Sequence, residues 1–256
     1  MIDTHAHLMF PEFKDDFESV ILRAKAAGLK GIVNVGCGVE ASRQSVEMAD
    51  GKFLYATVGL HPYDSLEISD ELMGEWENWI MEDKKGTLKK ILAIGETGLD
   101  YFKSKIDPEK QRLSFRKHLE LAQKTGLPVI VHNRDADEDC FNLLREFEDV
   151  KAVFHCFGST LKFAQKVWEA GYFTSFTGII TYPNAGELRE VVKAAPLEQI
   201  MIETDCPYLA PQAYRGKRNE PAYVVEVARC IADVRGLSFE EIVELVTKNS
   251  ERFFGI

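Results

Sequence analysis

The sequence predicts a closed parallel α/β barrel, the (β/α)8 or TIM-barrel class, on three observations. Short apolar runs alternate with amphipathic segments along the whole chain. Roughly eight of these runs are almost continuously apolar, which is typical of strands buried on both faces of a parallel sheet. The length of 256 residues is close to that of one such barrel. We therefore expect a single domain over residues 1–256.

The strands are predicted where short apolar runs are bounded by glycine, proline or polar residues. Each predicted strand precedes a segment of helical periodicity, as repeated β–α units require. In chain order, the predicted strands are Met1–His5, Gly31–Val35, Phe53–Val58, Ile91–Ile94, Pro128–His132, Ala152–His155, Tyr172–Thr177 and Ile200–Asp205.

The helices are predicted from apolar residues at helical spacing and from end signals. Pro108 in a first turn and Gly126 just beyond the last turn bound one of them. Ser238 followed by Glu241 forms a capping-box pattern at the start of another. In chain order, the predicted helices are Glu12–Ala27, Glu40–Ala49, Ser69–Lys85, Pro108–Thr125, Ala136–Phe147, Leu161–Ala170, Ala185–Ala194, Ala222–Val234 and Phe239–Phe253.

An open doubly wound sheet is the alternative, because it also alternates strands with helices. The common nucleotide-binding versions of that fold carry a Gly-x-Gly-x-x-Gly turn or a Gly-Lys-Ser/Thr phosphate loop after a strand. Neither pattern occurs at such a position. The closed barrel is therefore the favoured class.

Composition is that of an ordinary globular protein, with 45% hydrophobic and 28% charged residues. No apolar run approaches the roughly 18 residues of a membrane span, and no signal peptide is recognisable at the amino terminus. The five cysteines are scattered without a Cys-x-x-Cys pair, which favours a reducing compartment. We expect small buried thiols, a cytoplasmic location, no membrane partner and no obligate protein partner.

The net charge of −10 argues against a protein that coats duplex nucleic acid with a broad basic surface. It does not exclude an enzyme that holds a short anionic segment locally, because bound metal ions reverse the field at the site. The acidity therefore bears on the mode of binding and not on the class of substrate.

Chemically active side chains follow the ends of most predicted strands. In a parallel barrel these carboxyl ends meet at one mouth, where barrel enzymes place their active sites. The only histidine outside this pattern is His118, which lies in the middle of a predicted helix and is interpreted as a surface or packing residue. The residues at strand ends are His5 and His7, His61, Glu96, His132, His155 and Asp205, after strands one, three, four, five, six and eight.

These side chains suit divalent metal ions. His5 and His7, two residues apart on a strand, point to the same face, and imidazole is the commonest metal-ligating side chain. With Glu96 and Asp205, the histidines are sufficient for two ions if one carboxylate bridges them. Such mixed ligation favours zinc or manganese, and magnesium is possible if carboxylates and water dominate. Two ions about 3.5–4 Å apart would acidify a bridging water and stabilise the attacking and leaving oxygens of a displacement.

Six short motifs then give the chain a family resemblance. They resemble, in order, the motifs of the TatD-type metal-dependent deoxyribonucleases, a family of amidohydrolase-like barrels, and they extend over essentially the whole chain. The motifs are Asp3-Thr4-His5-Ala6-His7, Gly59-Leu60-His61-Pro62, Gly95-Glu96-Thr97-Gly98-Leu99-Asp100-Tyr101, Pro128–Arg134, His155-Cys156-Phe157-Gly158 and Glu203-Thr204-Asp205-Cys206-Pro207-Tyr208.

The resemblance implies a division of labour among the candidate ligands. The first metal would be bound by His5 and His7, and the second by His132 and His155. Glu96 would bridge both ions. Asp205 would ligate the first metal and take a proton from the attacking water. Glu203, two residues earlier, would lie deeper as a partner of the ligands or as a hydrogen-bonding residue of the inner core.

Two residues near the predicted ligands are candidates for contacts with the substrate, and each has an alternative structural role. His61 is assigned to a substrate phosphate or to the leaving-group oxygen, with a structural hydrogen bond before Pro62 as the alternative. Arg134 is a candidate phosphate clamp, or else a partner of Asp135 or Asp137 at the rim.

Further candidates for base stacking and phosphate contacts are Tyr101, Tyr208 and the basic segment Arg215–Arg218. Solvated loop charge is the alternative interpretation of the basic segment.

Three hypotheses follow. The leading one is a metal-dependent deoxyribonuclease, and the resemblance further implies exonucleolytic attack from the 3′ ends of single-stranded DNA. The second keeps the site but changes the bond to an amide, a lactone or a small phosphoester, since a fold does not choose among substrates. The third is a metal- or partner-binding protein without turnover, against which Asp205 and the complete ligand set count.

Overall fold

The computed structural model describes residues 1–256. Eight strands belong to one sheet, and their order in the sheet is their order along the chain. A doubly wound sheet would instead reverse its strand order at a switch point, so the predicted (β/α)8 class is confirmed. The strands are β1 (Ile2–Ala6), β2 (Gly31–Asn34), β3 (Leu54–Val58), β4 (Ile91–Asp100), β5 (Val129–Arg134), β6 (Ala152–Phe154), β7 (Phe173–Phe176) and β8 (Ile200–Ile202).

The end of the first strand is joined to the segment that follows the last, as a barrel requires. A parallel bridge links Ala6 to Cys206. The Asp205 amide donates to the carbonyl of His5 at 2.8 Å, and the His7 amide donates to the carbonyl of Cys206 at 2.9 Å. Two of the predicted site segments are therefore held side by side by backbone hydrogen bonds.

The helices follow the strands as predicted, with shifted ends. The helix expected over Glu12–Ala27 begins only at Phe17, because Pro11–Phe13 forms a separate 3-10 turn. The capping box of Ser238 and Glu241 is present. The α-helices are α1 (Phe17–Ala26), α2 (Val39–Met48), α3 (Asp70–Asp83), α4 (Pro108–Thr125), α5 (Asp137–Arg145), α6 (Leu161–Glu169), α7 (Gly186–Ala194), α8 (Val224–Arg235) and α9 (Phe239–Phe254).

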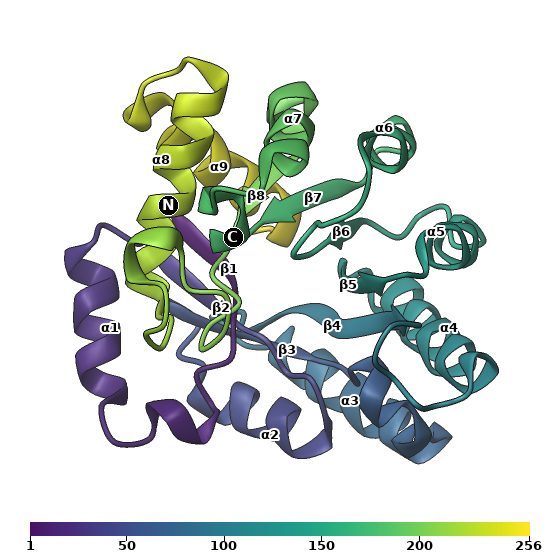
Figure 1. The fold of residues 1–256 in the computed structure, drawn as a ribbon. Helices are drawn as coiled ribbons and strands as arrows, with labels where there is room; N and C mark the ends of the chain where they lie inside the picture. The colour runs from purple at the N-terminus through teal and green to yellow at the C-terminus, as the bar shows by residue number, and fades with distance from the viewer. The chain divides into compact units, whose positions relative to one another are not determined.

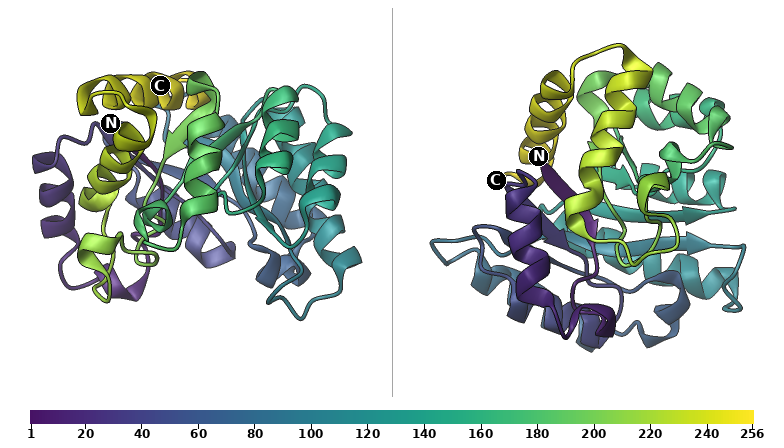
Figure 2. Two further views of the ribbon diagram at one scale, coloured as in Figure 1. Left: turned by 45° about the horizontal axis from the view of Figure 1, so that its top comes forward. Right: turned by 60° about the vertical axis from the view of Figure 1, so that its left-hand side comes forward.

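The residues group into two compact units, which we describe separately. The terminal unit comprises Met1–Asn34 and Cys156–Ile256, with β1, β2, β7, β8, α1 and α6 to α9. Both chain termini belong to it and lie near one another (Figure 2). Helix α9 packs against α8, β8 and β1. That the whole chain forms one domain stays a prediction.

The central unit, Val35–His155, contains β3 to β6 and α2 to α5 (Figure 1). Strand β4 pairs with β3 and with β5 and extends to Asp100, six residues beyond the predicted end at Ile94. Gly98 makes this extension possible. It has φ +144°, and a Cβ at this position would lie 2.0 Å from the carbonyl oxygen of His132, its partner in β5.

The core is mainly apolar, although strands such as β1 and β7 also bury polar side chains, among them Asp3 and Ser175. Its largest fully buried side chains include Trp76, Phe115, Phe154 and Phe176. None of the helices combines the length and apolar character needed to cross a membrane. All five cysteines are present as thiols, but only Cys140 and Cys206 are buried, so the expectation of burial is wrong for the half-buried Cys37, Cys156 and Cys230.

Candidate metal-binding site

The terminal unit brings three predicted ligands together at the end of β1. The Nε2 atoms of His5 and His7 lie 3.1 Å apart. The Oδ1 atom of Asp205 lies 3.4 Å from the Nε2 of His7 and 3.8 Å from that of His5. Ligands bound at about 2.1 Å around a tetrahedral ion are separated by roughly 3.4 Å. These three side chains, which we call the terminal ligand group, therefore fit a divalent ion.

Buried Asp3 holds the backbone beneath the terminal ligand group. Its carboxylate accepts hydrogen bonds from the Thr204 amide at 2.9 Å, the Thr204 hydroxyl at 2.6 Å and the His5 amide at 3.3 Å. Burial raises the pKa of Asp3 to about 8, although these hydrogen bonds act in the opposite direction. Asp3 belongs to the first sequence motif, but the residues alone did not indicate this role.

Glu203 makes the inner hydrogen bonds that were one of its two predicted roles. Its Oε1 atom accepts from the Cys156 amide at 2.6 Å, and its Oε2 atom accepts from the Ser175 hydroxyl at 2.5 Å. The side chain is almost fully buried. Glu203 therefore links the segment after β8 to Cys156 and to Ser175 of β7 within the terminal unit.

The central unit collects the other four predicted residues around one carboxylate. The Oε1 atom of Glu96 lies 2.8 Å from Nδ1 of His132 and 2.8 Å from Nε2 of His155. The Nε2 of His61 is 3.7 Å from the same oxygen. Ligand atoms of His61, Glu96 and His132 lie close enough together for a common ion. We call these four residues the central ligand group.

The electrostatics of the central ligand group favour an ionised carboxylate. Burial raises the pKa of Glu96, but the imidazoles of His155, His61 and His132 outweigh it and hold that pKa well below its ordinary value. Burial lowers the pKa of His132, yet the hydrogen bonds that its ring donates to Asp100 and Glu96 produce a net rise in that pKa. An ionised carboxylate that faces imidazole nitrogens is the donor set of a first-row divalent metal.

Asp100 orients His132, and sequence reasoning did not assign it a role. Its Oδ2 atom lies 3.1 Å from Nε2 of His132 and accepts from the Tyr63 hydroxyl at 3.1 Å. A carboxylate on the outer ring nitrogen of a ligating histidine fixes the tautomer and the ring orientation. The signal was alternation along β4, because Glu96, Gly98 and Asp100 share one face once the strand extends that far.

His61 is placed as a hydrogen-bond donor. Its Nδ1 accepts the Tyr63 amide at 3.1 Å, so a neutral ring carries its proton on Nε2, the nitrogen that faces Glu96. Burial lowers the pKa of His61 to about 4, which keeps the ring neutral at physiological pH. The predicted structural bond before Pro62 is thus present, and it leaves an N–H for a second partner.

A buried histidine of α4 supports the turn that carries His61. The Nε2 of His118 accepts the Leu60 amide at 3.0 Å, and its Nδ1 lies 2.7 Å from the carbonyl oxygen of Ser114. The ring packs against Trp76 and is fully buried. The surface alternative predicted for His118 is therefore wrong, because α4 turns this position toward β3 and not toward solvent.

Other predicted substrate contacts are distributed around these groups. The Tyr101 hydroxyl bonds to Asp139 and Arg112, both at 2.7 Å, on the face of β4 opposite to Asp100. The half-exposed Tyr208 packs edge-on against Phe10, which stacks on His7. Only Tyr208 of these two tyrosines is joined to a ligand group by ring contacts.

Cationic side chains near the site make specific contacts. The guanidinium group of Arg134 lies 4.3 Å above the ring of Phe102. In the basic segment Arg215–Arg218, Arg218 is paired with Asp16 through two contacts of 2.8 Å. The alternative of solvated loop charge is therefore wrong for Arg218, which joins this segment to the start of α1.

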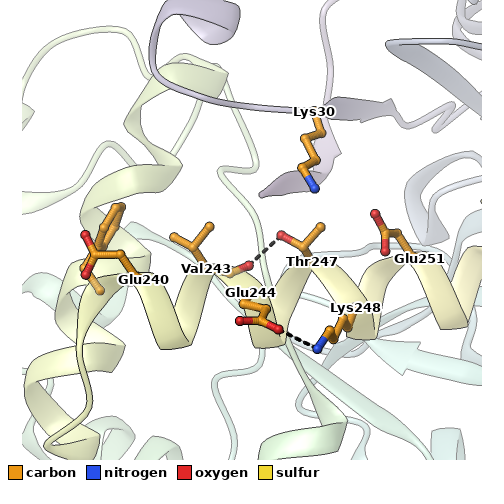
Figure 3. Close-up of a pocket in the computed structure, with 8 residues that line it drawn as sticks. Lys30, Glu240, Val243, Glu244, Thr247, Lys248 and Glu251 are labelled. Carbon is orange, nitrogen blue, oxygen red and sulfur yellow. Dashed lines mark hydrogen bonds and ion pairs between the residues drawn. The ribbon is translucent and has the colours of Figure 1, made fainter.

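A surface groove of about 360 Å³ lies elsewhere, along α9 (Figure 3). Its lining includes Lys30, Val243, Glu244, Thr247 and Lys248, and Lys248 forms an ion pair with Glu244. No histidine or cysteine lines it. The groove therefore offers no chemistry comparable with that of the two ligand groups.

Comparison with known proteins identifies the family. The profile described as "TatD related DNase" matches residues 2–255. The chain belongs to the TatD family. The uncharacterized metal-dependent hydrolase YabD of Bacillus subtilis is 40% identical, over 100% of this chain and 99% of that protein. The crystal structure of YJJV, a TatD homologue from Escherichia coli, superimposes with a TM-score of 0.92 at 29% identity, covering 100% of this chain and 98% of that one.

Membership in the TatD family makes the chain a metal-dependent hydrolase, in agreement with the donor atoms of both ligand groups. One further relative is named "3'-5' ssDNA/RNA exonuclease TatD", from Citrobacter rodentium. It is 33% identical over 100% of this chain and 98% of that protein. More distant structures, including an organophosphorus hydrolase from Deinococcus radiodurans at 16% identity and TM-score 0.63, share the fold alone.

Proposed function

We propose that this TatD-family hydrolase cuts phosphodiester bonds of single-stranded DNA and removes nucleotides from the 3′ end. The observation that carries the proposal is the presence of two groups of imidazole and carboxylate donors, each following strand ends of a (β/α)8 fold. The family description and the name of the Citrobacter rodentium relative support DNA as the substrate.

The proposal assigns two divalent ions, magnesium, manganese or zinc. His5, His7 and Asp205 would hold one ion, and His132 and His155 the other, with Glu96 as the bridging ligand. The proposal requires both groups to face the barrel mouth, where the carboxyl ends of the strands meet in this fold. When bound, the ions supply Lewis-acid activation of water and of the scissile phosphate.

The protein's own side chains would move the protons. Asp205 would take a proton from the attacking water. The Nε2–H group of His61 would donate to a phosphate oxygen or to the departing 3′ oxygen, because its Nδ1 is already engaged with Tyr63. A preorganised donor at a developing negative charge is among the strongest contributions a side chain makes to catalysis.

Arg134 and Tyr208 would complete the proposed substrate contacts, with the arginine as the partner of phosphate oxygens. Tyr101 is not retained, since its hydroxyl group is engaged between α4 and α5. The free thiols accord with the proposed cytoplasmic location.

The proposal is tested with single-stranded DNA labelled at either end and incubated with Mg²⁺, Mn²⁺ or Zn²⁺. We expect stepwise loss from the 3′ end that disappears in the Asp205→Asn variant. Asp139→Asn, the same chemical change at the α5 surface, is the matched control. Amide, lactone and small phosphoester substrates are assayed in parallel, and turnover of one of these alone would replace the nuclease proposal with the second hypothesis.

A further inference from the structure

A large aromatic side chain stands exposed at the end of β4, beside the central ligand group. Phe102 has 57% of its surface accessible to solvent. One face of its ring is covered by the guanidinium group of Arg134, at 4.3 Å from the ring centre. Arg134 ends β5 two residues after His132. The pair is therefore formed by the ends of the two strands that carry Glu96 and His132.

Hydrogen bonds anchor Phe102 to the site. Its amide donates to Oδ1 of Asp100 at 3.0 Å. The other oxygen of that carboxylate contacts Nε2 of His132 and the hydroxyl of Tyr63, each at 3.1 Å. Tyr63 is itself 45% exposed. One buried carboxylate thus positions a candidate metal ligand and two exposed aromatic residues.

We propose that Phe102, backed by Arg134, is a stacking platform for an unpaired nucleobase of the substrate strand. The inference rests on the proposed function and deepens it, because it names the residues that select an unpaired base. An aromatic face binds any base by stacking, and a guanidinium group adds cation–π attraction and a positive charge for the neighbouring phosphate.

The platform selects against the internal bases of paired DNA for a geometric reason. Both faces of an internal base in a duplex are covered by neighbouring base pairs, so neither can lie on the phenylalanine ring. An unpaired base has at least one face available. Amide, lactone and small phosphoester substrates without a planar ring have nothing to place on Phe102.

The test compares two single-stranded oligonucleotides that differ only in their bases near the 3′ end. One is intact, and the other carries abasic residues at its last three positions. Both strands carry hydrolysis-resistant phosphorothioate linkages for the binding measurement, which is made by fluorescence anisotropy with Mn²⁺, and hydrolysis is measured separately on ordinary strands. For Phe102→Ala we expect affinity for the intact strand to fall about 5- to 100-fold, the range for one base–aromatic stack. Affinity for the abasic strand should be unchanged.

Two variants serve as controls. Phe102→Tyr keeps the ring and should retain affinity for the intact strand. Leu113→Ala removes another exposed apolar side chain, on α4, and should affect neither strand. Equal loss on both strands, or no loss on either, would overturn the platform.

The outcome is separable from that of the proposed function. A base-selective loss of affinity without any strand hydrolysis would retain the platform and reject the nuclease proposal. Hydrolysis of both strands with no effect of Phe102→Ala would retain the nuclease proposal and reject the platform.

Discussion

The contacts of His61 define which of its ring nitrogens carries the proton. Its Nδ1 accepts the Tyr63 amide, so its proton is carried on Nε2 toward Glu96. We expect His61→Ala to lower kcat about 100-fold or more, the usual size of a lost proton donor. Metal content, measured by inductively coupled plasma mass spectrometry, should not change. A variant that loses an equivalent of metal would show that His61 is a ligand.

Asp100 acts on the metal through His132. Its carboxylate contacts the ring nitrogen that points away from Glu96. Loss of such a partner typically weakens metal binding about 10- to 100-fold. We therefore expect Asp100→Asn to weaken binding of the ion assigned to His132 and His155 by that factor, as measured by competition with a chelator. Asp139→Asn is the matched control, and equal affinities in the two variants would contradict the role of Asp100.

Residues that act by orienting a metal ligand, as Asp100 does, were the hardest to predict from the sequence. Glu96 and the five site histidines could be selected because their chemistry suits metals and they follow predicted strands. Asp100 and Asp3 act through hydrogen bonds to other residues, and only a known strand register reveals which atoms they meet. Phe102 was overlooked in favour of its neighbour Tyr101, because both rings lie beyond the end of β4 and only the structure shows which one is exposed.

At the scale of elements, α4 supports the turn between β3 and α3 through His118. The ring is buried and accepts the Leu60 amide, and burial lowers its pKa to about 4, from 6.5 in the unfolded chain. Between pH 6.5 and about pH 4, His118 is therefore protonated in the unfolded chain but neutral in the folded chain. His118 thus stabilises the fold fully above pH 6.5 and loses this contribution through that interval.

We expect His118→Gln, which keeps an acceptor for Leu60 but does not titrate, to flatten the pH dependence of stability. The native chain should lose up to about 3 kcal/mol more than the variant between neutral pH and pH 4. Urea unfolding at several pH values measures the difference. His61 has a similarly lowered pKa but is present in both proteins, so it does not contribute to the difference. Parallel curves of stability against pH would therefore contradict the role of His118.

Strand β4 depends on a glycine at its closest approach to β5. A side chain at Gly98 would meet the carbonyl oxygen of His132 and would require φ +144°. We expect Gly98→Ala to cost about 1–3 kcal/mol of stability from backbone strain and to weaken metal binding by displacing His132. Gly126→Ala at the end of α4, where φ is also positive but no atom is near, is the control. Equal effects of the two substitutions on metal affinity would refute the contact argument.

Element positions were largely predictable, and element ends were not. The apolar runs located all eight strands, because both faces of a parallel strand are buried. The end of β4 was set too early since Gly95 and Gly98 resemble strand breakers in sequence. The start of α1 was set too early because Glu12 and Phe13 continue the helical periodicity, although Pro11–Phe13 forms a separate turn.

At the scale of the whole molecule, one strand–helix unit repeats along the chain. Most strands end at or within three residues of a polar side chain, and the order of strands in the sheet follows the chain. This regularity explains how residues as distant as His5 and Asp205 come together. Under the proposed function, bound ions and not surface lysines would supply the positive charge that an acidic chain needs to act on an anionic substrate.

The most direct test of the account is the number of metal ions that one chain binds. After loading with Mn²⁺ or Zn²⁺ and removal of excess metal, native mass spectrometry should show two ions on the wild-type chain. The His5→Ala/His7→Ala variant should show at most one. A wild-type chain that carries a single ion, or none, would contradict the two-metal site.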